Sequence, residues 1–249
     1  MRMLLKALFT VPFVAVAVSA HAIPIVGTSF GSFSSLGSCD NSGGSRDCRI
    51  VTTAANGPDT QVQWGSTSDS TEFVSPSTLT SVDLNINAGT PALGTQIGRL
   101  DWFNSATIAA EDLDSLSVDW KLTLAFTSPN SASGSEVFDL TIDNPLNPAG
   151  DLVHGLLLAD LNSLDAKINL NGVSITNLRY AVVDSAATSG TSYFSNNVWF
   201  NDENNWSSLY IMADFTATAT KVPEPTTLAL LGLGLLIAGW SVHRRARQN

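Results

Sequence analysis

Residues 116–126 read LSVDWKLTLAF, and this stretch decides the fold class of the chain. Large apolar residues occupy every second position along it, and the positions between them are polar up to Thr123. Because successive side chains of a β-strand point to opposite faces, a period of two predicts a half-buried strand. The apolar positions are Leu116, Val118, Trp120, Leu122, Leu124 and Phe126, and the polar positions are Ser117, Asp119, Lys121 and Thr123.

The same period recurs on both sides of this run. Shorter alternating sets occur at Val82, Leu84 and Ile86, at Phe138, Leu140 and Ile142, and at Ala166, Ile168 and Leu170. Further candidate strands cover 50–54, 96–103, 177–183 and 206–218. In INLNGVSI, at 168–175, Asn171-Gly172 lies between alternating apolar residues, which is a strong hairpin signal. The stretch AGDLVHGLLLADLNSLD, at 149–165, is compatible with a helix or with two buried strands.

About eight to ten short strands separated by Gly, Pro, Asn and Asp predict one all-β domain over 23–221, an antiparallel β-sandwich or jelly roll. At 249 residues the chain is long enough for such a domain. Residues 23–221 hold 7 basic and 21 acidic residues, a net charge of −14. This acidic body argues against nucleic acid and anionic lipid as partners, because both are bound mainly through Lys and Arg.

The first 22 residues have the features of a signal peptide. Arg2 and Lys6 precede an apolar stretch from Ala7 to Val18, and Ala20 and Ala22 form the small-x-small pattern that signal peptidase accepts. We expect cleavage after Ala22 and export of the body. An uncleaved anchor helix is the alternative, but the apolar stretch is short for a membrane span.

A second apolar run lies near the other end of the chain. Residues 226–242 are 17 in number and carry no charge before His243, so they can just cross a bilayer as a transmembrane helix. Arg244, Arg245 and Arg247 follow. Since cationic flanks stay on the cytoplasmic side, the C-terminus is expected inside and the body outside.

Residues 222–249 together resemble the PEP-CTERM sorting tail of Gram-negative bacteria. The resemblance rests on Val222-Pro223-Glu224-Pro225, on the Gly-rich apolar stretch LLGLGLLIAGW and on the terminal Arg cluster. It implies that an exosortase, a membrane protease-transpeptidase, recognises the tail and releases or attaches the protein at the cell exterior. The family is typical of bacteria that make extracellular polysaccharide and biofilm. A plain single-pass anchor that is never cut is the alternative.

The body is similar to the choice-anchor domains, especially the K type, over about residues 45–220. The motifs, in order, are VQWGSTSDSTEF, ALGTQIGRLDWFNSATI, LDSLSVDWKLTLAF and SGSEVFDLTIDNPLN. Where that family commonly carries a His before the Asn, this chain has Trp102-Phe103-Asn104. The resemblance implies a secreted all-β module without an assigned reaction.

Cys39 and Cys48 are the only cysteines, and they lie nine residues apart in CDNSGGSRDC. In an exported chain this spacing predicts a disulfide that closes a short loop. A zinc site would need two further ligands, and the neighbouring sequence supplies none.

We expect no enzymatic activity and no cofactor. The only histidine between the terminal segments is His154, in LVHGLLL, and no G-x-S-x-G, H-E-x-x-H, Walker or dinucleotide-binding motif is present. Two segments between strands are rich in oxygen ligands and could hold structural calcium, although turn geometry alone also favours Asp and Asn there. These ligands are Glu111, Asp112 and Asp114 in one segment, and Asp143, Asn144, Asn147 and Asp151 in the other.

Five aromatic residues raise a carbohydrate-binding alternative, in which sugar rings stack on an edge of the sandwich around NNVWFNDENNW, at 196–206. They are Trp64, Trp102, Trp199, Phe200 and Trp206. The competing interpretation places these rings in the core. The sequence as a whole therefore predicts an exported structural protein of the cell surface or extracellular matrix. It is exported by the general secretory route, is held transiently in the inner membrane by its tail, is processed by signal peptidase and an exosortase, and associates with exopolysaccharide. The rival is a lectin-like binder or a weak hydrolase.

Overall fold

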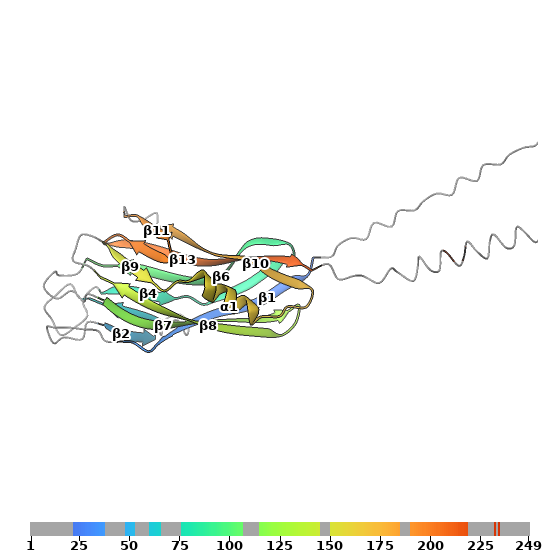
Figure 1. Cartoon of the computed structure of the whole chain (residues 1–249), viewed down its shortest axis with the longest axis horizontal. Coiled ribbons are helices and arrows are strands. Elements are labelled where there is room, and N and C mark those ends of the chain that lie inside the picture. Colours follow the sequence, from blue (N-terminus) through green and yellow to red (C-terminus); the bar gives the residue numbers. More distant parts are fainter. Residues whose placement is uncertain are drawn as a thin grey trace, which may run out of the picture.

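The computed structural model of the chain describes residues 22–37, 48–52, 60–65, 76–106, 115–144, 150–184 and 190–218, together with Gly232 and Gly234. Within these ranges the chain forms two antiparallel sheets that pack face to face as a β-sandwich (Figure 1). The predicted fold class is confirmed at that level. The seven-stranded sheet has the order β11-β12-β9-β8-β7-β1-β5, and the six-stranded sheet has the order β10-β13-β6-β4-β3-β2.

The elements follow one another in a chain of strands with a single described helix. They are β1 (Pro24–Ser34), β2 (Cys48–Thr52), β3 (Thr60–Trp64), β4 (Ser77–Ser81), β5 (Leu84–Gly89), β6 (Ala92–Asn104), β7 (Ser115–Ser128), β8 (Ala132–Asp143), β9 (Asp151–His154), α1 (Leu158–Ala166), β10 (Val173–Asp184), β11 (Ser192–Ser195), β12 (Val198–Asn201) and β13 (Asn205–Ala217).

Strand β7 lies in the middle of the seven-stranded sheet, between β1 and β8. All six of its predicted apolar side chains are at most 2% exposed, whereas the residues between them are exposed or half-buried. Each such burial contributes about 1.5–3 kcal/mol. The alternation of LSVDWKLTLAF is therefore the alternation between the core and the outer face of the sheet.

Most of the other strands predicted from alternation are also present. The sets at 50–54, 82–86, 96–103, 138–142, 177–183 and 206–218 fall on β2, β5, β6, β8, β10 and β13. Periodicity places the strands better than it places their ends, since β6 and β10 begin four residues before the predicted start. Local turn geometry and pairing with the neighbouring strand decide those ends.

The sequence missed β1, whose residues are PIVGTSFGSFS. Its inward positions are Ile25, Gly27, Ser29, Gly31 and Phe33, so three of the five carry almost no apolar signal. The reason is visible at Gly31, where a Cβ would lie 2.5 Å from Trp120 Nε1 and would also collide with Ser81 Oγ. Trp120 Nε1 donates a hydrogen bond of 3.0 Å to Ser81 Oγ in the facing sheet. Glycine leaves room for that bond between the sheets.

The segment 149–165 contains one strand and one helix, which differs from both predicted alternatives. Asp151–His154 is β9, and Leu158–Ala166 is α1, which buries Leu161 and Leu164. The strand predicted at 166–170 is wrong, because Ala166 ends the helix and Leu170 makes only an isolated bridge to Val173. Leu161 and Leu164, three residues apart, form the apolar stripe of a short helix. The apolar residues that follow at 166, 168 and 170 happen to be spaced by two, which suggested a strand.

Two Asn-containing turns behave differently from the sequence expectation. At Asn171-Gly172 the turn is present, with a bond of 3.2 Å from Val173 N to Leu170 O, but no hairpin of two full strands forms around it. The two-residue hairpin that the sequence missed joins β11 to β12 through Asn196 and Asn197. Both residues have positive φ, 52° and 65°, as a type I′ turn requires.

The two ends of the described body lie at the same end of the sandwich (Figure 1). Thr218 N donates to Gly172 O at 2.9 Å, and an ideal Cβ on Gly172 would lie 3.5 Å from Ile23 Cδ1. Ile23 in turn pairs with Thr90, whose backbone N donates to its carbonyl at 3.0 Å. Ile23, Gly172 and Thr218 therefore lie close together at this end of the sandwich.

Replacing Gly31 by alanine tests the packing of β1 between the sheets. The added methyl group forces Trp120 or Ser81 from its position, and we expect a loss of about 1–3 kcal/mol in the free energy of unfolding. Gly89→Ala is the matched control, because its Cβ would meet only Ala22 Cβ at 3.7 Å. Urea denaturation of the exported body measures both; equal stability of the two variants would contradict this packing.

Candidate functional site

Four of the six tryptophans belong to the core. Trp64, Trp102 and Trp199 are 0% exposed and Trp120 is 1% exposed. The Trp102 ring contacts the other two, with centroid distances of 6.2 Å to Trp64 and 5.0 Å to Trp199. Trp64, Trp102 and Trp199 therefore cannot stack on a sugar ring. For the half-buried Phe200 and the exposed Trp206, the suggested role stays a prediction. The rings at Trp64, Trp102 and Trp199 fill the space between the sheets, as the competing interpretation has it.

Trp206 is the exception, with 45% of its surface exposed. It lies on β13 directly opposite Phe103 of β6, on the outer face of the six-stranded sheet. The two rings are stacked, with centroids 4.9 Å apart and planes inclined by 29°. Phe103 therefore fixes the orientation of an indole ring that keeps nearly half of its surface exposed to solvent.

Trp206 borders a shallow pocket with a volume of about 290 Å³. Strands β6, β10 and β13 lie side by side there and supply all of its lining residues. The lining residues are Arg99, Asp101, Val183, Asp184, Trp206, Ser207, Ser208 and Tyr210. The alternation of each strand explains the arrangement, since Leu100, Trp102 and Leu209 are buried in the core.

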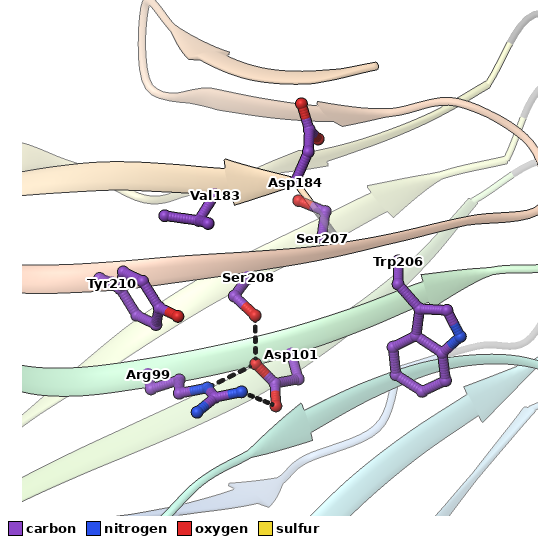
Figure 2. Close-up of a pocket in the computed structure, with 8 residues that line it drawn as sticks. All are labelled: Arg99, Asp101, Val183, Asp184, Trp206, Ser207, Ser208 and Tyr210. Carbon is purple, nitrogen blue, oxygen red and sulfur yellow. Dashed lines mark hydrogen bonds and ion pairs between the residues drawn. The ribbon is translucent and has the colours of Figure 1, made fainter. Parts of the chain in front are cut away.

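The centre of the pocket is a closed set of polar contacts (Figure 2). Arg99 donates two hydrogen bonds to Asp101, from Nε at 2.7 Å and from Nη2 at 2.8 Å. Ser208 donates a third to the same carboxylate at 2.6 Å. The hydrogen bond with Asp101 raises the pKa of the Arg99 guanidinium above its ordinary value, so the guanidinium remains charged.

Aromatic rings stand on both sides of this pair (Figure 2). The guanidinium carbon of Arg99 lies 5.6 Å from the centre of the Tyr210 ring, within the range of a cation–π contact. Trp206 lies on the opposite side. At the rim, Asp184 accepts a hydrogen bond from the Ser192 hydroxyl. The pocket thus offers ring faces together with fixed donors and acceptors, which suits a ligand that has both apolar faces and hydroxyl groups.

A row of polar side chains continues from the pocket across the outer face. Asp101 lies opposite Thr80 of β4, and Gln61 Nε2 of β3 donates to Thr80 Oγ1 at 2.8 Å. Gln63 Nε2 donates to Gln61 Oε1 at 2.6 Å, and Arg49 Nε of β2 donates to Gln63 Oε1 at 2.7 Å. A row of polar side chains therefore crosses the outer face from β13 to β2, and its members on β4, β3 and β2 are hydrogen-bonded to one another.

The candidate calcium ligands do not gather into one described site. Glu111, Asp112, Asp114 and Asn147 lie outside the described residues. Asn144 and Asp151 are buried in the core, where Trp64 Nε1 donates to Asp151 at 3.3 Å. Asp143 instead contacts His154 Nε2 at 2.9 Å, and both of these side chains are partly exposed. Across the described parts of the chain, no three His, Cys, Asp or Glu side chains are placed to hold a metal ion.

The remaining predicted sites lie largely beyond the described ranges. Cys48, the first residue of β2, is disulfide-bonded and buried, while Cys39 lies outside them, so the pairing of the two stays a prediction. Of the signal peptide, only Ala22 is described. Of the tail, only Gly232 and Gly234 are described, so the structure does not test the sorting motif, the span at 226–242 or the Arg cluster. Among described residues, no helix has the length and apolarity needed to cross a bilayer.

Comparison with known proteins bears on the tail. Residues 221–245 match the family model of the PEP-CTERM protein-sorting motif, which confirms that part of the resemblance. The motif indicates an exported, membrane-processed protein that is sorted by an exosortase. No curated protein and no solved structure matches the chain. The similarity of the body to choice-anchor domains therefore stays a prediction.

The different environments of the two tryptophans give a direct test of the site. Trp199→Ala empties a fully buried position and should cost about 3–5 kcal/mol of stability. Trp206→Ala removes one stacking contact and should cost about 1 kcal/mol. Thermal or urea unfolding of the two variants provides the comparison. A loss for Trp206→Ala as large as that for Trp199→Ala would show that Trp206 is a core residue.

Proposed function

We propose that this chain is a structural protein of the bacterial cell surface or extracellular matrix, delivered there by exosortase sorting and associated with exopolysaccharide. The match of residues 221–245 to the sorting motif carries the proposal. The signal peptide predicted at 1–22 and the positive charges at Arg244, Arg245 and Arg247 favour the same orientation, with the body outside the cytoplasm.

The structure supplies a geometric argument for how the tail works. Thr218 is bonded to Gly172 of the body, and the membrane span is predicted to begin at residue 226. Eight residues of extended chain reach at most about 28 Å. While the tail is in the inner membrane, the end of the sandwich that holds Ile23 and Thr218 therefore stays within about 28 Å of the outer face of that membrane. Processing near Pro223-Glu224-Pro225 would free the body from it.

The properties of the body favour a structural role over an enzymatic one. Its sequence lacks the nucleophile, metal and nucleotide motifs considered above, and the described pocket contains an ion pair whose charges are engaged with each other. The net charge of −14 over 23–221 disfavours nucleic acid and acidic surfaces as partners. We extend the proposal to the choice-anchor resemblance, which would make the body one of the all-β modules carried by surface anchors.

Fractionation of cells with and without the exosortase gene tests the proposal. We expect the protein in the matrix or outer-surface fraction of wild-type cells. Without the exosortase it should remain in the inner-membrane fraction, because the apolar segment is no longer removed. Replacing Pro223, Glu224 and Pro225 together by alanine should reproduce that retention.

Substitution of Leu93 by alanine serves as a control in the body, because Leu93 is 77% exposed and the change leaves the motif intact. The proposal fails if the protein reaches the matrix equally well without the exosortase. It also fails if the protein is found in the cytosol with residues 1–22 still attached.

A further inference from the structure

Trp206 is the described tryptophan that the fold leaves in solvent, and its position is fixed. The other four described tryptophans are at most 1% exposed, against 45% for Trp206. An isolated exposed aromatic side chain is ordinary on a protein surface. Here the indole is stacked on Phe103 and borders a pocket, so it presents a flat apolar surface without a loss of side-chain freedom on binding.

The polar groups beside Trp206 are also held in place. Asp101 is fixed by Arg99 and Ser208, and its carboxylate can accept further hydrogen bonds. The Arg99 side chain is 34% exposed, and its guanidinium has five N–H donors, two of which bond to Asp101. Donors and acceptors therefore stand together within reach of one ring face, and a polyol presents the complementary groups.

The geometry points to a neutral polysaccharide as the ligand of this outer face, with one sugar unit stacked on Trp206 and hydrogen-bonded to Asp101, Arg99 and Ser208. This inference rests on the proposed function and identifies the part of the body that would contact the exopolysaccharide. The pocket volume of about 290 Å³ is at the lower end of the range for ligand pockets, which suits a short part of a longer chain.

Charge decides between neutral and acidic glycans. The Arg99 charge is compensated by Asp101, and Asp184 adds a negative charge to the same pocket. The body carries a net charge of −14. A uronate or sulfate group would be repelled and would find the pocket's cation already engaged, whereas hydroxyl groups need no net charge.

The polar row beyond the pocket favours a chain over a single sugar. Ser208, Asp101, Thr80 and Gln61 occupy neighbouring strands in register, and Arg49 and Gln63 continue the row to β2. Strands are spaced by about 4.8 Å, so five strands present about 19 Å of polar surface. Successive units of an extended polysaccharide that crosses the strands could meet side chains along that whole distance.

Binding of defined glycans to the mature protein purified from its own cells tests the inference. The probes are cellohexaose and dextran as neutral glycans and polygalacturonate as the acidic one. The fluorescence of Trp206 should change on binding a neutral probe, because the other described tryptophans are shielded from solvent. Trp206→Ala should weaken binding by at least about tenfold, Trp206→Phe should recover part of it, and Asp101→Asn should also weaken it.

Phe30→Ala is the matched control, because Phe30 is 44% exposed on β1 of the other sheet. Its affinity should equal that of the unmodified protein. The inference is overturned if Trp206→Ala binds as well as Phe30→Ala, if polygalacturonate binds more tightly than either neutral probe, or if neither neutral probe binds. It is also overturned if Trp206→Ala only converts an oligomer of this chain to a monomer. Normal export and processing alongside any of these results would leave the proposed function standing.

Discussion

The burial of one face of β7 against the six-stranded sheet is the constraint on which the rest of the structure depends. Six alternate side chains of LSVDWKLTLAF enter the core together, so a slip of one residue would expose all of them. Trp120 adds a directional contact, since its indole N–H bonds to Ser81 of the facing sheet. That bond fixes the position of β4 relative to β7, and it requires that Gly31 on β1 have no side chain.

The predictable part of the fold is the part in which apolar residues carry the alternation. Strands β7 and β8 could be placed from sequence because their inward residues are large and apolar. Strands β1 and β4 could not, because their inward positions include Gly31, Ser77 and Ser81. These small residues are buried for reasons of space and hydrogen bonding in three dimensions. The alternation of apolar residues does not reveal an inward-facing glycine whose role is to leave space for a tryptophan on another strand.

The candidate site was predictable in composition but not in position. Trp199 and Trp206 lie in the same Asn-rich segment, and the sequence does not show which of the two is exposed and able to bind a ligand. The Asn196-Asn197 turn and the pairing of β13 with β6 decide between them, since they direct Trp199 to the core and Trp206 to the surface. The same pairing brings Ser208 to Asp101 over a sequence separation of 107 residues. The only sequence signal for this contact is the alternating pattern of the two strands, which places Asp101 and Ser208 on the polar face of each.

The sorting tail begins only a few residues after the point at which the chain leaves the sandwich. The body holds Ile23 and Thr218 at one end, and the motif at 221–245 follows almost at once. The intact mass of the protein recovered from the cell exterior tests this account most directly. The account predicts a species that begins at Ile23 and ends close to Pro223–Pro225. A mass corresponding to a chain that still extends to Asn249 would contradict it.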